Sequence, residues 1–164
     1  MPAANTYTQI ASTTTSGNAT SVTFSSIPAT YTDLIIVFNG SASGTSGDLA
    51  RFNSDTGANY SSTFMRGDGS SAASGRVPSA TSINPGLTFG TSQSTYIMQI
   101  MNYANTTTYK TALYRSSSVA TSSYVGAAVA LWRSTAAINT INFFTSGTNY
   151  VNGSTFSLYG VTAA

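Results

Sequence analysis

The sequence predicts an all-β protein, an antiparallel β-sandwich of roughly ten short strands in one domain. Stretches with alternating apolar and polar residues recur along the chain, and clusters of Gly, Ser, Asn and Pro separate them. The chain's 164 residues suffice for one domain with a buried core. No repeat of fixed period is visible, which argues against a solenoid or propeller. We therefore expect a jelly-roll-like sandwich over residues 1–164, with no helix.

The first strands are expected near the N-terminus, after a short arm over residues 1–6. Tyr7–Ala11 has a weak strand pattern. Thr20–Ser25 alternates clearly, with Val22 and Phe24 on one face, and Ser26–Pro28 ends it.

Asp33–Asn39 is expected to be the central strand of the domain. Its apolar residues fall on both faces: Leu34, Ile36 and Phe38 on one, Ile35 and Val37 on the other. A strand with two apolar faces is typically covered on both sides, so we expect cover on both faces here.

Two shorter, half-polar strands are predicted at Asp48–Asn53 and Tyr60–Arg66. The next segment, residues 67–93, consists mainly of Gly, Ser, Ala and Pro, and Pro78 and Pro85 limit its flexibility. We expect this segment to form a long loop that contacts a partner. The N-terminal arm is also expected to contact a partner.

The second half predicts a hairpin and three further strands. Thr95–Tyr103 pairs with Thr108–Arg115 across a turn at Asn105–Thr107. Ser123–Trp132 contains enough Ala for a helix, but Tyr, Val and Trp among its larger residues favour a strand. Ile138–Thr145 and Thr155–Val161 close the domain, and their expected inward residues are Ile141, Phe143, Phe156 and Leu158.

The chain is unusually poor in charge. Only 6% of its residues are Asp, Glu, Lys or Arg, against about 25% in an ordinary soluble domain. Ser and Thr occupy 54 of the 164 positions, and their hydroxyls form hydrogen bonds without carrying charge. Such a surface can lie against neighbours without burying unpaired ions, so we expect a chain that works in an assembly.

The composition also argues against several function classes. No His or Cys occurs, which removes the commonest general base, the strongest nucleophile and the usual zinc ligands. We expect no enzyme, no catalytic residues, no cofactor and no metal. The six basic residues are scattered singly, so we expect no nucleic-acid partner, and no apolar stretch suggests a signal peptide or a membrane partner.

Three motifs allow a functional or a structural interpretation. Asn53–Asn59 has oxygen-bearing residues at every second position, as a calcium loop does, but it lacks the closing Glu, and a turn is favoured. Arg66-Gly67-Asp68 matches a cell-adhesion tripeptide. The structural interpretation is the end of a strand followed by a turn. Ten Tyr and one Trp could stack on sugars, or fill sheet faces.

Several blocks in order along the chain carry a resemblance to a known family. They are Ser21–Pro28, Tyr31–Leu34, Arg51–Tyr60, Gly67–Ser70, Leu131–Ile138 and Phe156–Gly160. The set resembles small virion proteins of tailed bacteriophages that infect cyanobacteria and other aquatic bacteria.

This resemblance implies a β-sandwich that serves as a building block of the virus particle. The expected role is a capsid decoration (cement) protein on the capsid surface. It is expected to clamp the major capsid protein by non-covalent contacts and to form a homo-oligomer, with a trimer as the expected state. The alternative is a tail-fibre or tail-tip module that binds host surface glycans. A third possibility is a secreted carbohydrate-binding module of a cell.

Overall fold

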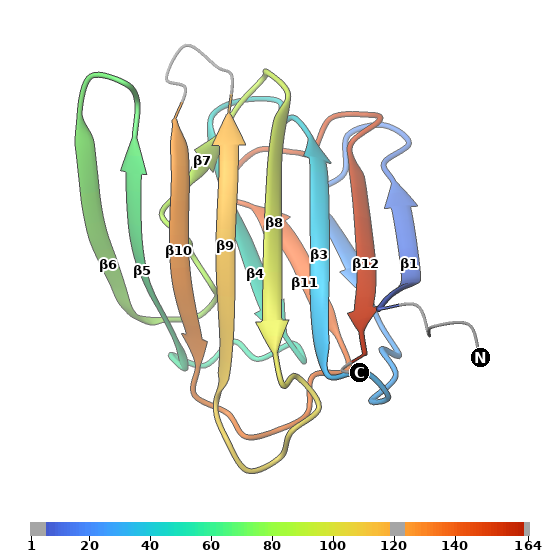
Figure 1. Ribbon diagram of the computed structural model, residues 1–164. Helices are drawn as coiled ribbons and strands as arrows, with labels where there is room; N and C mark the ends of the chain where they lie inside the picture. Colours follow the sequence, from blue (N-terminus) through green and yellow to red (C-terminus); the bar gives the residue numbers. More distant parts are fainter. Residues whose placement is uncertain (1–5, 119–123, 163–164) are drawn as a thin grey trace.

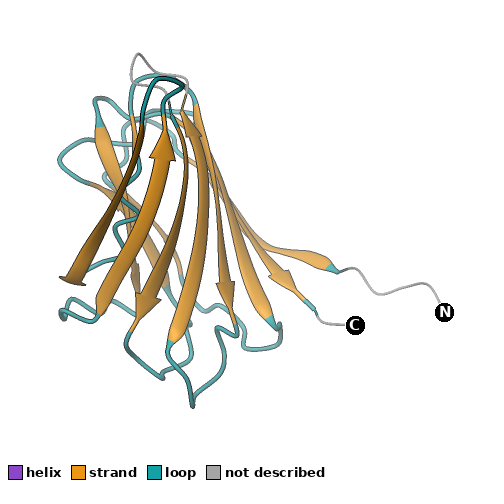
Figure 2. Ribbon diagram, turned by 60° about the vertical axis from the view of Figure 1, so that its left-hand side comes forward, coloured by secondary structure: helices purple, strands orange, loops and turns teal. Residues whose placement is uncertain are grey.

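The computed structural model describes residues 6–118 and 124–162, and within these ranges it contains twelve strands and no helix. The strands form two antiparallel sheets packed as two layers (Figures 1 and 2). An all-β sandwich is therefore confirmed. Their bounds are β1 Tyr7–Thr14, β2 Ser21–Phe24, β3 Asp33–Gly40, β4 Ser46–Phe52, β5 Tyr60–Gly67, β6 Ala72–Ala80, β7 Thr88–Phe89, β8 Ser94–Met101, β9 Lys110–Ser118, β10 Val125–Trp132, β11 Ile141–Thr145 and β12 Thr155–Val161.

The two sheets differ in size. The large sheet has eight strands in the order β1-β12-β3-β8-β9-β10-β5-β6, and the small sheet has four in the order β2-β11-β4-β7. In Figure 1 the large sheet lies in front of the small one. A jelly roll places eight strands in a double sheet. The division into eight and four strands differs from that pattern, so the jelly-roll expectation is not confirmed.

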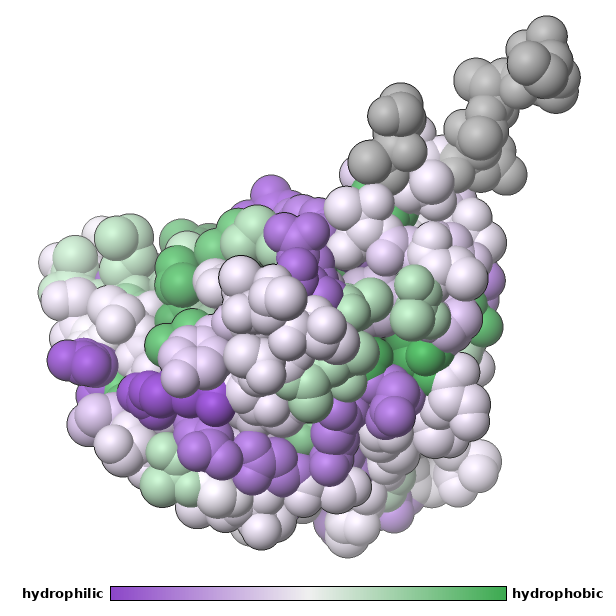
Figure 3. Space-filling model, turned by 90° about the horizontal axis from the view of Figure 1, so that it is seen from below, coloured by the Kyte–Doolittle hydropathy of each residue, from purple (hydrophilic) through white to green (hydrophobic). Residues whose placement is uncertain are grey.

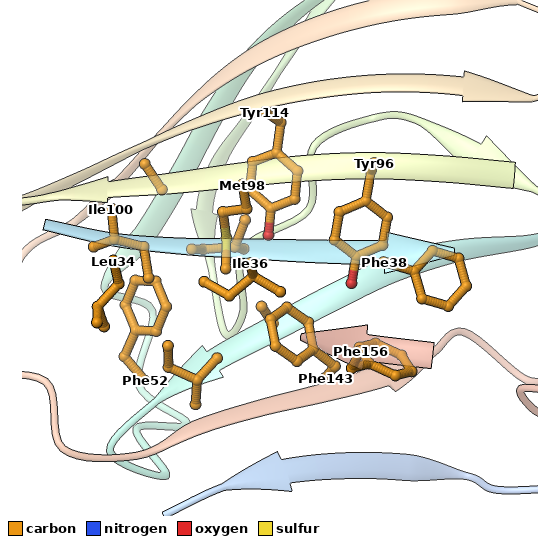
Figure 4. Packing of buried hydrophobic residues seen from close by; sticks show 14 of the residues in the cluster. Leu34, Ile36, Phe38, Phe52, Tyr96, Met98, Ile100, Tyr114, Phe143 and Phe156 are labelled. Carbon is orange, nitrogen blue, oxygen red and sulfur yellow. The ribbon is translucent and has the colours of Figure 1, made fainter. Parts of the chain in front are cut away.

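The core lies between the layers and is built by simple alternation. In β3, Leu34, Ile36 and Phe38 are fully buried, as predicted. They meet Phe143 of β11 and other apolar residues of the small sheet in one cluster (Figure 4). The predicted inward residues of the last two strands are likewise fully buried: Ile141, Phe143, Phe156 and Leu158.

The predicted hairpin between residues 95 and 115 is confirmed, with β8 and β9 in antiparallel register. The Asn105 side chain shapes the turn between them, because its Oδ1 accepts hydrogen bonds from the backbone nitrogens of Thr107 and Thr108 at 2.7 and 2.9 Å. β10 continues this meander beside β9, and so residues 125–132 form a strand rather than a helix.

Two expectations need correction. Residues 67–93 are not one long loop, because they contain β6 and β7. β6 pairs with β5 along most of its length, and this pairing outweighs the low strand propensity of its Gly, Ser and Pro residues. In addition, β3 is covered on one face only within the described residues, since Ile35 and Val37 face away from the small sheet. Most of the predicted N-terminal arm, residues 1–5, lies outside the described ranges.

Candidate interaction surface

The outer face of the large sheet, which points away from the small sheet, is the main feature not occupied by the core. The register of the strands aligns its side chains in rows. One row runs through Ile35, Gln99, Leu113, Val129 and Thr63, and ends at Arg76 of edge strand β6. A second, adjacent row runs through Val37, Ile97, Arg115, Ala127 and Met65. Each of the strands β3, β8, β9, β10 and β5 therefore contributes at least one apolar side chain to the two rows.

Exposure confirms that this outer face is uncovered within the described residues. Met65 and Val125 are each 66% exposed, Val129 is 49% exposed and Leu113 is 38% exposed. Tyr7 on β1 lies opposite Val161 of β12, which places it on the same face. Most of the large apolar side chains that are exposed in this chain thus gather on one side.

The outer face is also hollowed. One hollow of about 640 Å³ lies over β5, β8, β9 and β10, with Leu113 and Val129 among its lining residues. A second hollow of about 760 Å³ adjoins it towards β6. Met65, Arg115 and Ala127 line both, so the two form one groove across the strands.

The surface away from this groove has a different character. Seen from below, most of it is pale, the colour of weakly polar residues such as Ser, Thr and Gly, and only limited areas are strongly hydrophilic (Figure 3). This agrees with the abundance of hydroxyl side chains in the sequence. Weakly polar residues thus make up much of the surface in this view, with apolar areas among them.

A buried polar cluster lies inside the sandwich. Asp48 of β4 is 4% exposed and faces the core. The Tyr150 hydroxyl donates a 2.7 Å hydrogen bond to Asp48 Oδ1. The Tyr114 hydroxyl has no hydrogen-bond partner in the described part of the chain, whereas the Tyr96 hydroxyl lies near enough to Asp48 to lower the pKa of its carboxyl. Figure 4 shows both of these hydroxyls pointing between the sheets.

This cluster changes the acidity of Asp48. Burial raises the pKa of the Asp48 carboxyl to about 7, and the hydrogen bond from Tyr150 opposes part of the rise. A hollow of about 20 Å³ beside Asp48, Tyr96, Tyr114 and Ser116 has room for about one water molecule. The site is too small and too enclosed for a substrate, so we assign it a structural role.

The Asn53–Asn59 block forms a turn built around Asp55. Asp55 Oδ1 accepts from the Gly57 nitrogen at 2.8 Å, and Oδ2 accepts from Asn59 Nδ2 at 2.9 Å and from Trp132 Nε1 at 2.7 Å. Burial acts to raise the pKa of Asp55, but these hydrogen bonds outweigh it and hold the pKa below its ordinary range. Protein donors thus use both oxygens, as the turn interpretation requires.

The other two motifs also serve the fold. The Arg66 guanidinium lies 5.2 Å from the centre of the Tyr124 ring, and Asp68 Oδ1 accepts from the backbone nitrogens of Ser70 and Ser71, which closes the β5–β6 turn. The aromatic residues mostly fill the sandwich. Trp132 is buried, as are six of the ten tyrosines: Tyr60, Tyr96, Tyr103, Tyr114, Tyr124 and Tyr150.

Lys110, the single lysine, donates from Nζ to the carbonyl oxygens of Thr108 and Thr135 at 2.8 and 3.1 Å. Within residues 6–118 and 124–162, no three acidic, His or Cys side chains gather as metal ligands would. These ranges also hold no helix long and apolar enough to cross a membrane.

Comparison with models of protein families, with curated proteins and with solved structures finds no match for this chain.

Proposed function

We propose that this chain is a structural protein of a tailed-bacteriophage particle, a capsid decoration protein that clamps the shell surface by non-covalent contacts. Its partner in this proposal is the major capsid protein, and its place is the capsid surface. The observation that carries the proposal is the uncovered apolar outer face of the large sheet. Soluble monomers rarely expose contiguous apolar patches of this kind, whereas subunits of assemblies bury them.

The low charge supports the same function. A subunit buried among neighbours loses the hydration of its charged groups, and each unpaired ion then costs several kcal/mol or more. Only 6% of this chain is charged, so large parts of its surface can be covered without that cost. Hydroxyl groups meanwhile supply neutral hydrogen-bond donors and acceptors to whatever lies against them.

We place the shell contact on the β5–β6 side of the molecule. β6 is the edge strand of the large sheet, and Ala72, Ala73 and Ser74 at its start are all exposed. The turn before β6 is held by Asp68 and so presents a defined shape. This region belongs to the segment 67–93 that the sequence marked for partner contact.

The alternative of a glycan-binding tail module receives less support from the structure. Sugar platforms need exposed aromatic rings, and here Trp132 and most tyrosines are buried in the fold. Tyr7 and Tyr109 are exposed, but Tyr7 lies on β1 and Tyr109 lies in the turn before β9, with several strands between β1 and β9. A receptor-binding role is therefore treated as an outcome of the test.

The test is the copy number of this protein in purified particles of the phage that encodes it. Quantitative mass spectrometry would compare its peptides with those of the major capsid protein. We expect a copy number comparable to that of the capsid protein. A far smaller number would place the chain in the tail and overturn the decoration function, and absence from particles would overturn any virion role.

A second measurement tests the clamp itself. Shells lacking the protein are heated or exposed to osmotic shock, with and without added purified protein. We expect the added protein to raise the temperature at which shells open. Equal resistance in both samples would contradict a clamping role.

A further inference from the structure

We infer that the outer face of the large sheet is where two copies of this chain join, face to face. The inference deepens the proposed function by naming the partner of this face, and it rests on that proposal only for the pair's place in the particle. Each of the five neighbouring strands β3, β8, β9, β10 and β5 places at least one apolar side chain on this face, with Gln99 and Arg115 between them in the two rows.

The outer face is large enough to hold a stable pair. Strands lie about 4.8 Å apart and rise about 3.3 Å per residue, so the flat area of the eight-stranded sheet is about 1000 Å². A specific interface takes about 800 Å² from each partner. The five apolar strands β3, β8, β9, β10 and β5 alone supply about 600 Å². The face thus has the area that a stable dimer needs.

Charge does not oppose the pairing. On the five apolar strands the outward charged residues are Asp33 and Arg115, at different rows of the sheet, and β6 adds Arg76 beside Thr63. Asp33 already accepts hydrogen bonds from Gln99 Nε2 and from the Asn102 nitrogen, at 3.2 and 2.9 Å. The rest of this region is apolar or neutral. Two copies can therefore bury it without bringing many like charges together.

The edges of the sheet are poorly suited to pairing with a second copy by strand addition. Edge strand β6 carries Pro78, which lacks a backbone N–H donor, and Arg76, whose charge resists burial. Edge strand β1 contains a bulge between Gln9 and Ala11, which interrupts a regular ladder. Both features are known to protect edges from pairing with other chains.

Apolar surface needs apolar surface opposite it, and this favours a second copy. Of the six large apolar side chains that are exposed within residues 6–118 and 124–162, five lie on the outer face: Tyr7, Met65, Leu113, Val125 and Val129. A ring of three copies would need a second apolar patch elsewhere on the chain, because each copy then uses two different surfaces. A twofold pair uses the same face twice, so a pair takes the place of the trimer in this inference.

The experiment measures the solution mass of the purified full chain by analytical ultracentrifugation. We expect the wild-type protein to sediment at twice 16.9 kDa at micromolar concentration. Val129→Glu would place a charge in the middle of the apolar rows, and we expect it to shift the protein to the monomer and weaken association at least 100-fold. Thr63→Glu, at an exposed position of the same row, should act in the same direction.

The matched control is Ser21→Glu, which adds the same charge at an exposed position of β2 in the small sheet. We expect this variant to remain a dimer. Circular dichroism checks that each variant keeps its strand content. A monomeric wild-type protein, or a dimer that survives both outer-face substitutions, would overturn the inference.

The two proposals fail separately. A dimer that depends on Val129 but is absent from particles would leave the inference standing and overturn the virion function. The protein could instead be abundant in particles but monomeric in solution, with Val129→Glu binding shells as well as the wild type does. That result would support the virion function and overturn the dimer.

Discussion

The Tyr150 hydroxyl donates a 2.7 Å hydrogen bond to a carboxyl oxygen of Asp48, which is buried in the sandwich. Tyr150 lies in the connection before β12, and its backbone also exchanges two hydrogen bonds with Ala19 before β2. Its ring stacks on Phe89 of β7 with centroids 5.9 Å apart. One tyrosine thus joins the closing connection of the chain to the small sheet.

Tyr150→Phe should destabilise the protein while keeping the packing of the ring. The variant removes the hydroxyl and leaves Asp48 Oδ1 buried without a partner, which costs about 2 kcal/mol. Tyr114→Phe is the matched control, because the Tyr114 hydroxyl has no hydrogen-bond partner in the described ranges. It should change the free energy of unfolding by less than about 0.5 kcal/mol. Urea denaturation at pH 8 measures both, and equal losses would contradict this account.

Stability should fall as the pH rises from about 4 to about 7. The folded protein holds the proton on Asp48 more tightly than the unfolded chain does, because burial raises the pKa of this carboxyl to about 7. In that interval the folded state binds one proton more, so the free energy of unfolding decreases by about 4 kcal/mol in total. Above pH 7 the effect levels off. The chain has no His or Cys, so no other side chain has its ordinary pKa between 5 and 8.

Asp48→Asn provides the control for this pH dependence. The amide resembles the protonated carboxyl in shape and can still accept from Tyr150, but it does not titrate. We expect urea denaturation between pH 5 and pH 8 to show a flat profile for the variant, because Asp55 and Asp68, whose pKa values are lowered, change protonation only below that interval. At pH 8 the variant should be more stable than the wild type. A variant that retains the wild-type slope would show that another group is responsible.

The fold is most predictable where the residues of a single strand alternate clearly between apolar and polar or between two faces. Leu34, Ile36 and Phe38 alternate so regularly that both the strand and its buried face follow from the sequence. β6 was missed because its residues have low strand propensity, and it forms only because β5 offers it a hydrogen-bonding partner. Such pairing depends on residues distant in sequence, and local patterns do not reveal it.

The interaction surface and the buried acid were harder to predict. The apolar outer residues Ile35 and Val37 were visible in the sequence, but they were interpreted as a second buried face. Whether a second layer of the same chain covers that face depends on where the small sheet lies. The burial of Asp48 also depends on residues distant in the sequence. From its own residues β4 is predicted to be a half-polar strand, and only its packing partners show that Asp48 is buried.

Asp55→Ala should destabilise the fold by about 1–3 kcal/mol. The Asp55 carboxylate receives hydrogen bonds from Gly57, Asn59 and Trp132, and thereby ties the Asn53–Asn59 turn to the end of β10. Asp68→Ala is the control, since that carboxylate also accepts backbone hydrogen bonds but closes a fully exposed turn. Its effect should be clearly smaller. Trp132 fluorescence during urea denaturation reports both, and a larger loss for Asp68→Ala would contradict the assignment.

Gly160→Ala should disturb the packing of the closing strand. Gly160 lies on the buried face of β12, and a Cβ there would overlap the ring of Tyr31, which covers this position. Overpacking of this kind costs about 1–3 kcal/mol, because the ring must move off its site.

Gly47→Ala in β4 is the control. The nearest atom to its new methyl group is Leu49 Cδ2 at 4.0 Å, so it has room, and alanine should be neutral or slightly stabilising in a strand. Thermal unfolding of the two variants measures the difference. If Gly160→Ala melts at the wild-type temperature, Tyr31 does not pack on this glycine as described, and the tight closure of β12 over the core would have to be abandoned.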